Sequence, residues 1–345
     1  YDRSQVIMIG DQLMTDVLVA KRLGLYTILV EPIHLHSDEN DIFTNAGYYD
    51  IRNDLALLVD SVEMLNEEQN FSGDSVFYDK KRNFGIGWNN VTIQDSTQGY
   101  IIKGNYAEHY ENGGTSFVTD STLLILIDQG DSLYLHSDTL SVIFDSLQEP
   151  QELHAFNKVK FYRNDIQGVC DSMSILVEDS LLTMYYNPVL WYGSNQLSGD
   201  TIRMCVIDSS NMTMDILENG FIIEDVFEEK EFNQIKGERI KGYITDKRLR
   251  QVDVINNVEC VYYVLEEDSS LIGINASITN EMRIFLENNK LKEILFYTNP
   301  DGALYPYNKF PEDKKILKEF RWLNLYRPKS ISEIFHTAIP RRWEE

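Results

Sequence analysis

The chain has 345 residues, enough to bury a sizeable core, and its 43% of hydrophobic residues excludes general disorder. Asp and Glu number 55 against 31 for Lys and Arg, and the net charge of −24 argues against a nucleic-acid partner because it repels phosphate backbones. No apolar run reaches the roughly 18 residues of a membrane helix, so we expect no transmembrane segment.

The first predicted elements form a small α/β fragment. Residues 6–9 are all apolar, as in a strand buried on both faces, and Gly10 and Asp11 end that strand. A helix with apolar positions from Val17 to Leu23 follows, and then a second apolar strand at 26–30. Two strands joined by a helix in this way predict a parallel pair.

This corner, VIMIGDQLMTDVLVAKRLGLYTILVEPI, resembles the haloacid-dehalogenase (HAD) superfamily in its small YqeG-like phosphatase branch, where GDQxxTD is the last of four motifs. The resemblance covers residues 1–34 and implies that Asp11 and Asp16 help to hold Mg²⁺, which prefers oxygen ligands. The chemistry also needs a nucleophilic aspartate two positions before an acid/base aspartate, and no two aspartates here have that spacing. We therefore expect no catalytic residue and no cofactor, with Mg²⁺ bound only if the HAD site were complete.

The region from about residue 35 to 335 repeats. Seven segments each begin with a small or turn residue followed by a polar one, at spacings of 29 to 38 residues: Gly73, Gly104, Ser137, Cys170, Gly199, Gly237 and Gly273. Five of the segments end with an aspartate that suits a turn: Asp79, Asp145, Asp179, Asp208 and Asp246. Residues 54–65 fit a helix or a strand equally well.

A second kind of strand alternates apolar and polar residues with period two. Its apolar positions would share one face: Val91 with Ile93, Val159 with Phe161, Val189 with Trp191, Phe221 with Ile223, and Val258 with Cys260. An asparagine stands at the entrance to each of these strands: Asn90, Asn157, Asn187, Asn219 and Asn257. A repeat made only of strands cannot bury its apolar face alone, so stacked hairpins are expected to bury it between two curved sheets.

We therefore predict a mainly β fold, an elongated open β-jelly roll or β-solenoid of stacked hairpin repeats that follows the short α/β fragment. The predicted domains are the HAD-like fragment at 1–34, the repeats at 35–298, and a Pro-rich C-terminal cap with a basic tail at 299–345.

Three stretches then carry a resemblance that covers residues 36–335. GVCDSMSILVEDSLLTMYYNPVLWYGSNQLSGDTI, EFNQIKGERIKGYI and NPDGALYP are similar to OstA-like proteins of the lipopolysaccharide transport (LptA-type) family, in the form found in Bacteroidetes. The resemblance implies a periplasmic jelly roll whose apolar interior holds lipid A acyl chains. It also implies partners that are other lipopolysaccharide transport proteins, joined by pairing of end strands.

The function expected from this resemblance is transport of lipopolysaccharide toward the outer membrane. The groove candidates are Val91, Ile93, Val159, Phe161, Val189, Trp191, Phe221, Ile223 and Val258. A sealed core made of the same residues is the structural alternative, and it would leave a β-solenoid that binds only protein. The alternative from another class is a HAD-type, Mg²⁺-dependent phosphatase.

The expected location is the periplasm or the outer membrane, and residues 6–9 are too short an apolar run for a signal-peptide core. Lys314, Lys315, Lys318 and Arg321 lie on a helix-like run that we interpret as part of the cap, with contact to a lipid head group as its alternative. The charged stretch at 227–239 is interpreted as a solvated hairpin. The three cysteines fit no zinc spacing and are interpreted as small apolar residues.

Overall fold

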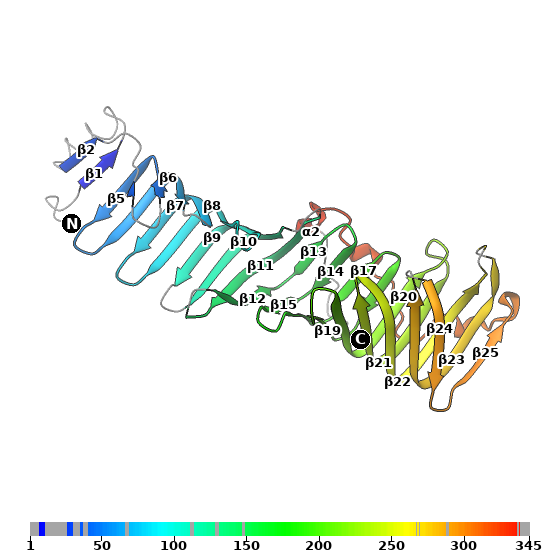
Figure 1. Cartoon of the computed structure of the whole chain (residues 1–345). Coiled ribbons are helices and arrows are strands. Elements are labelled where there is room, and N and C mark those ends of the chain that lie inside the picture. Colours follow the sequence, from blue (N-terminus) through cyan, green and yellow to red (C-terminus); the bar gives the residue numbers. More distant parts are fainter. Residues whose placement is uncertain are drawn as a thin grey trace. The chain divides into compact units, whose positions relative to one another are not determined.

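The computed structural model describes residues 7–10, 26–29, 35–36, 41–65, 69–110, 114–127, 131–146, 149–266, 268, 270–287, 290–336 and 338. These residues form strands joined by turns, and the only α-helix among them is the short α2 (Glu333–His336). The fold is mainly β, as predicted. The chain separates into two compact units, Tyr1–Phe156 and Asn157–Glu345 (Figure 1). The boundary at residue 156 differs from the predicted boundaries at 34 and 298. Residues 1–34 and 299–345 are not separate units, because each is in contact with the neighbouring strands of its own unit.

The first unit is a series of antiparallel hairpins. Its strands are β1 (Ile7–Gly10), β2 (Tyr26–Leu29), β3 (Leu35–His36), β4 (Asp41–Phe43), β5 (Ala46–Asp50), β6 (Leu55–Leu65), β7 (Gln69–Asp79), β8 (Phe84–Asp95), β9 (Tyr100–Tyr110), β10 (Thr115–Leu126), β11 (Leu133–Phe144) and β12 (Pro150–Phe156). Each strand from β6 to β12 pairs antiparallel with the next one. The ambiguous stretch at 54–65 is therefore a strand.

The N-terminal fragment contains the predicted parallel pair. β1 pairs with β2 in parallel register, with Ile7 opposite Tyr26. The other edge of β1 pairs antiparallel with β5, so this fragment continues the sheet of the hairpins. The helix predicted between the two strands lies outside the described residues.

Five of the long strands, β6, β8, β10, β20 (Asn211–Asp225) and β22 (Arg248–Leu265), bend once near the middle, at two successive residues with positive φ. These pairs are Asp60 and Ser61, Asn89 and Asn90, Asp120 and Ser121, Glu218 and Asn219, and Asn256 and Asn257. Asn and Asp enter this left-handed region more readily than other residues with a side chain, which explains the recurring asparagines of the sequence. The pairing register shifts at the same places, for example between Trp88 and Val91.

Each bend folds one half of a strand over the other half. A Cβ built on Gly87, before the bend of β8, would lie 2.8 Å from Cζ of Phe71 and 3.2 Å from Cγ2 of Val91, which follows that bend. We call the face that looks toward the other half the inner face, and the opposite one the outer face. Each unit is thus a stack of folded hairpins with apolar side chains between the two halves.

The neighbouring strand at each bend carries one of the glycines that begin the repeats. A Cβ on Gly104, Gly199 or Gly237 would lie within 2.4 to 2.5 Å of a branched apolar side chain on the next strand. The polar residue after the glycine meets the asparagine across the bend: Asn219 Nδ2 donates to both carboxylate oxygens of Asp200 at 3.2 and 3.1 Å. Asn90 and Asp74 repeat this contact. We call each bend, together with the residues of adjacent strands that pack against it, a corner. Each repeat in the sequence therefore corresponds to one corner of the structure.

Gly104→Ala is expected to lower the free energy of unfolding by about 1 to 3 kcal/mol, because the new methyl group would sit 2.4 Å from Val118 Cγ1 and force that side chain to move. Urea denaturation followed by circular dichroism measures the change. Gly85→Ala is the matched control, since its Cβ would have ordinary contacts at 3.7 Å or more. Equal stability of the two variants would contradict the corner-packing argument.

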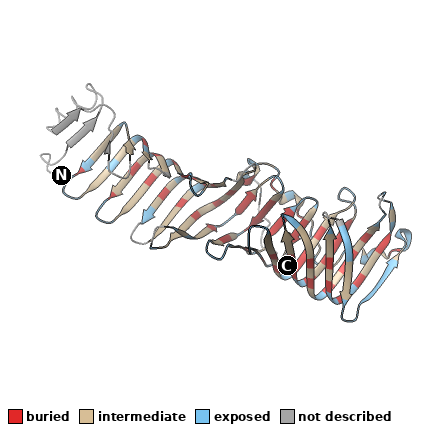
Figure 2. Ribbon diagram, in the orientation of Figure 1, coloured by how far each residue is buried: buried red, intermediate tan, exposed pale blue. Residues whose placement is uncertain are grey.

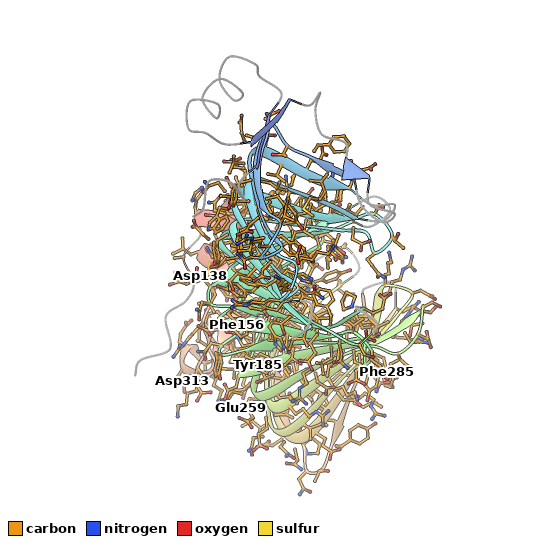
Figure 3. The ribbon with its side chains drawn as sticks, turned by 90° about the vertical axis from the view of Figure 1, so that its left-hand side faces the viewer. Asp138, Phe156, Tyr185, Glu259, Phe285 and Asp313 are labelled. Atoms are coloured by element: carbon orange, nitrogen blue, oxygen red, sulfur yellow. The ribbon has the colours of Figure 1, made fainter. Side chains whose placement is uncertain are left out.

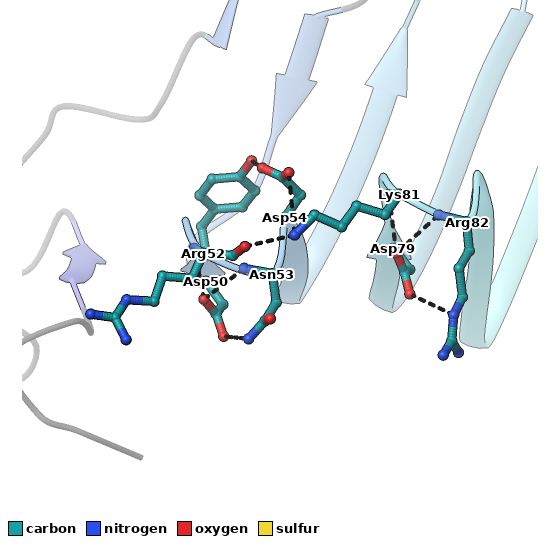
Figure 4. Close-up of polar contacts among 8 residues, drawn as sticks. Asp50, Arg52, Asn53, Asp54, Asp79, Lys81 and Arg82 are labelled. Atoms are coloured by element: carbon teal, nitrogen blue, oxygen red, sulfur yellow. Dashed lines mark hydrogen bonds and ion pairs between the residues drawn. The ribbon is translucent and has the colours of Figure 1, made fainter.

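The aspartates that end the segments cap the turns between strands. Asp79 accepts from the backbone N–H groups of Lys81 and Arg82, both at 3.1 Å (Figure 4). Asp50 and Asp208 do the same for the turns that follow them. Side-chain hydrogen bonds from Asn53 to Asp50 and from Asn211 to Asp208, together with these backbone bonds, favour the charged carboxylates and lower the pKa of Asp50 and of Asp208. The predicted turn role of Asp79, Asp145 and Asp208 is confirmed.

The second unit has shorter strands at its start and long bent strands later. They are β13 (Val159–Tyr162), β14 (Ile166–Cys170), β15 (Ser172–Leu176), β16 (Leu181–Tyr185), β17 (Val189–Tyr192), β18 (Asn195–Ser198), β19 (Thr201–Val206), β20 (Asn211–Asp225), β21 (Phe232–Thr245), β22 (Arg248–Leu265), β23 (Leu271–Glu287), β24 (Lys290–Tyr297) and β25 (Asp301–Tyr305). One half of this unit contains β13, β14, β17, β18, β25 and residues 220–225, 232–236, 258–265 and 271–279.

After β25 the chain crosses the outer face of this half as a covering segment, residues 306–336. It contains three 3-10 turns, η4 (Tyr307–Lys309), η5 (Glu312–Lys314) and η6 (Asn324–Tyr326), and ends in α2, which contacts β13 (Figure 1). The helix-like interpretation of the run from Lys314 to Arg321 is wrong. Lys314 ends η5, Lys315 and Ile316 form a bend, and a turn at Lys318 and Glu319 is closed by the hydrogen bond from the N–H of Phe320 to the carbonyl of Leu317 at 3.2 Å. The predicted cap at 299–345 begins instead with a strand.

Candidate functional site

The inner face of the first unit is apolar across many strands. Cross-strand pairing puts Phe71, Ile93, Ile102, Leu124 and Leu135 in one row of one half. The facing half has a row with smaller members, namely Val76, Gly87, Ala107, Val118 and Leu140. Side chains leave the strands toward both faces, and the buried residues recur along the middles of successive strands (Figures 2 and 3).

Burial on this face varies along the inner row. Phe71 and Ile93 are only half-buried, whereas Ile102 is 5% exposed and Leu124 and Leu135 are each 1% exposed. Tyr100 stands near the strand end, where burial and the carboxylate of Asp95 raise its pKa to about 12. The interior is therefore more accessible at β7 and β8 than at β10 and β11.

The inner face of the second unit is more tightly closed. Six residues from successive strands of one half are no more than 1% exposed: Met184, Ile202, Ile216, Ile240, Val254 and Met282. Phe161 lies opposite them, because a Cβ on its pairing partner Gly168 would meet Phe161 at 2.4 Å and Met184 at 3.3 Å. Burial also raises the pKa of the Cys260 thiol to about 12, which keeps it neutral and supports its interpretation as an apolar core residue.

Polar side chains occupy the inner face of the second unit near the strand ends. Glu224, Asn233 and Tyr262 follow one another in register on three strands, and Asn233 Nδ2 donates to Glu224 Oε2 at 2.8 Å. Asn233 Oδ1 also accepts from the backbone N–H of Tyr263 at 2.7 Å. Burial and the charge of Glu224 raise the pKa of Tyr262 to about 12. The apolar interior is thus less extensive in this unit than in the first.

Three hydrophobic clusters join the covering segment to the outer face of the second unit. Leu323 packs with Val169, Val189 and Trp191. Further along the segment, Leu317, Phe320 and Trp322 pack against Phe221, Ile223 and Phe232, while Phe310 packs against Val261, Tyr263 and Ile274. This half of the unit is therefore buried on both faces.

Two glutamines hold the backbone of the covering segment. Gln234 donates to the carbonyl of Lys315 at 2.7 Å and accepts from the N–H of Leu317 at 2.9 Å. Gln196 donates to the carbonyl of Arg321 at 2.7 Å and accepts from the N–H of Leu323 at 2.7 Å. Both glutamines are 0% exposed. Each side-chain amide thus pairs with two backbone groups that would otherwise be buried without a partner.

The loop between β20 and β21 forms hydrogen bonds with the covering segment. Glu229 accepts from the Trp322 indole at 3.0 Å and from Asn324 Nδ2 at 2.7 Å, and these bonds lower the pKa of Glu229. Glu231 accepts from the hydroxyl of Tyr307 at 2.8 Å. The interpretation of residues 227–239 as a purely solvated hairpin is wrong, because these carboxylates complete the polar contacts of the covering segment.

The nine groove candidates separate into two groups. Val91 and Ile93 lie on the inner face of the first unit, and Val159, Phe161 and Val258 lie on the inner face of the second. Val189, Trp191, Phe221 and Ile223 face the covering segment, so their assignment to a groove is wrong. Period-two alternation identifies residues that share a face, but in a half that is buried on both sides it does not say which face looks inward. Acyl binding by the inner group stays a prediction.

Other predicted sites have no described structure or no cluster of ligands. Asp11 and Asp16 lie outside the described residues, and no group of three or more His, Cys, Asp or Glu suited to a metal occurs in the part that the structure describes. A cavity of about 320 Å³ lies between β22, β23, β25 and the covering segment, with Glu259 and Asp313 among its lining residues (Figure 3). None of the described helices is long and apolar enough to cross a membrane.

The described strands define this protein as one built of stacked, bent β-hairpins with an apolar interior. Residues 1–40 match the model of the HAD-hydrolase-like family, which agrees with the resemblance of the N-terminal fragment. The fold is similar to that of LptH from Pseudomonas aeruginosa, the LptA-homologous periplasmic component of its lipopolysaccharide transport device. That match has a TM-score of 0.30 and 10% identity, and it covers 34% of this chain and 81% of LptH. A search of curated proteins finds no significant match.

Proposed function

We propose that the protein binds the acyl chains of lipopolysaccharide in the apolar interior of its hairpin stack and acts in lipopolysaccharide transport. The observation that carries this proposal is the continuous inner row of the first unit, from Phe71 to Leu135, which is only half-buried at Phe71 and Ile93. An acyl chain entering between the halves would gain roughly 0.8 kcal/mol for each methylene that it buries.

The small residues of the facing half support entry in the first unit. Gly85 and Ala107 present little side chain to the inner face, and a Cβ on Gly85 would meet no atom closer than 3.7 Å. In the second unit the inner residues are sealed, and Glu224 lies near the strand ends. We therefore assign acyl binding to the first unit. The resemblance of residues 36–335 to the LptA-type family supports the same assignment, and we propose that the protein acts in the periplasm or at the outer membrane.

Partners would join at the last strand of the stack. β25 pairs with β23 along one edge, and four of its five residues are exposed. An exposed strand edge can accept a strand from another protein through backbone hydrogen bonds. We propose that other lipopolysaccharide transport proteins pair here.

The proposal is tested by loading purified protein with lipid A and measuring bound lipid by mass spectrometry. Ile93→Asp should reduce loading about tenfold or more, because a carboxylate on the inner face would have to be desolvated beside the acyl chain. The matched control is Gln94→Asp, one residue along β8 and exposed on the outer face. A folded Ile93→Asp protein, checked by circular dichroism, that loads lipid as well as the control would refute the proposal.

A second candidate function rests on the match of residues 1–40 to the HAD-hydrolase-like family. It predicts Mg²⁺-dependent hydrolysis of a phosphate ester, with Asp11 and Asp16 as the metal ligands. Turnover of a generic phosphate ester that disappears in Asp11→Asn would favour this candidate over lipid transport.

A further inference from the structure

The covering segment differs in charge from the rest of the chain. Residues 306–336 contain seven Lys and Arg against four Asp and Glu, a net charge of +3, so the remaining residues carry −27. Lys309, Lys318 and Lys329 are exposed and form no ion pair in the part of the chain that the structure describes. The exposed residues of this segment, which form its outward side, include five Lys and Arg against three Asp and Glu. The outward side is therefore a weakly cationic strip on an acidic protein.

Three large apolar side chains of this segment are exposed as well. Leu325 is 86% exposed, Ile316 is 51% exposed and Ile331 is 40% exposed. Isolated exposed apolar residues are ordinary on protein surfaces, but here they alternate along one segment with exposed lysines. Such a strip has the composition of a surface that lies at a membrane interface.

The neighbours of two of these side chains are held to the sheet. Ile316 lies between the carbonyl of Lys315 and the N–H of Leu317, both of which are bonded to Gln234, and it also lines the cavity beneath the segment. Leu325 lies in η6 between Asn324, bonded to Glu229, and Tyr326, which packs against the cluster around Trp191. Leu325 is therefore exposed on a part of the segment whose backbone is anchored on both sides.

We propose that the outward side of the covering segment docks on an anionic lipid bilayer, with Ile316, Leu325 and Ile331 entering the interface and lysines meeting the lipid phosphates. The three apolar residues are spaced by nine and six positions along an extended segment, which suits a flat surface better than the single central cluster typical of a protein contact. The acidic remainder is repelled by the same bilayer, and this repulsion orients the protein with the strip toward the lipid.

The test is flotation of the full chain with vesicles of phosphatidylglycerol and phosphatidylcholine, compared with vesicles of phosphatidylcholine alone. The protein is expected to bind the anionic vesicles more strongly, and binding should weaken as salt is raised. Leu325→Asp should weaken binding about tenfold or more, because an inserted apolar side chain becomes charged. The double substitution Lys318→Glu and Lys329→Glu should remove the preference for anionic lipid.

The matched control is Ile207→Asp, which charges another isoleucine that is 63% exposed and lies after β19 in the same unit. The proposal would be overturned if the Leu325→Asp protein bound vesicles as well as the control protein, or if the unsubstituted protein bound the two kinds of vesicle equally. It would also be overturned if Leu325→Asp altered only the self-association of the protein, measured by sedimentation, because the strip would then be a protein contact. Ile93→Asp should bind vesicles normally, so failure of interior lipid loading and failure of docking are distinguishable.

Discussion

Replacing Trp191 by alanine is expected to lower the free energy of unfolding by about 3 to 5 kcal/mol, the usual cost of removing a large buried aromatic side chain. Trp191 is 0% exposed and packs with Val169, Val189 and Leu323 between the sheet and the covering segment. Urea denaturation followed by far-ultraviolet circular dichroism measures the change. A cost below about 1 kcal/mol would mean that the covering segment does not bury this face in solution.

The substitution Trp191→Phe separates the contribution of ring packing from that of the indole N–H group. The Trp191 indole nitrogen is buried with no hydrogen-bond partner among the described residues. Phenylalanine keeps much of the ring and removes that donor, so the loss of apolar contact is offset by relief of an unsatisfied group, and the expected cost is less than about 1.5 kcal/mol. A cost as large as that of alanine would show that the nitrogen has a partner, such as a water molecule.

The double substitution of Gln196 and Gln234 by alanine is expected to release the covering segment. Each glutamine satisfies one carbonyl and one N–H of that segment, and an unpaired buried polar group costs about 1 to 3 kcal/mol. Four backbone groups lose their partners, of which the N–H of Leu323 is buried and the other three are part-buried. We expect unfolding to be easier by about 2 to 4 kcal/mol.

Hydrogen–deuterium exchange separates release of the segment from general unfolding. Backbone amides at Leu317 and Leu323 should lose protection, while those of β22 keep it. Gln94→Ala is the matched control, since Gln94 is also on an outer face but is exposed. Unchanged protection of Leu317 and Leu323 in the double variant would show that the apolar clusters alone hold the segment.

The strands were predictable because local chemistry determines them, but their bends were not. Asn90, Asn219 and Asn257 were expected at the entrances of strands, and they lie instead with positive φ inside the single strands β8, β20 and β22. Gly104 and Gly237 occur where a Cβ would collide with a neighbouring valine. These are short-range requirements. The parallel pairing of β1 and β2 followed equally from two short apolar runs at a distance that needs a crossover.

The covering segment was not predictable in the same way. Gln196 and Gln234 resemble ordinary polar positions of alternating strands, and the groups that they bind lie 81 to 127 residues away. The assignment of Trp191 and Phe221 to a groove failed for the same reason, since only tertiary contact decides what covers a face. A glutamine enclosed by apolar neighbours in a strand was a usable signal, because a buried amide requires partners.

The corners described above have a consequence for how such a protein can change its length. Each corner is determined by a few residues on adjacent strands, such as Asn219 with Asp200, and needs nothing from distant strands. A pair of strands can then be gained or lost in evolution while the flanking ones keep their geometry, as happens when nearest-neighbour terms dominate stability. Proteins of this architecture can differ in the number of strands and still share one cross-section.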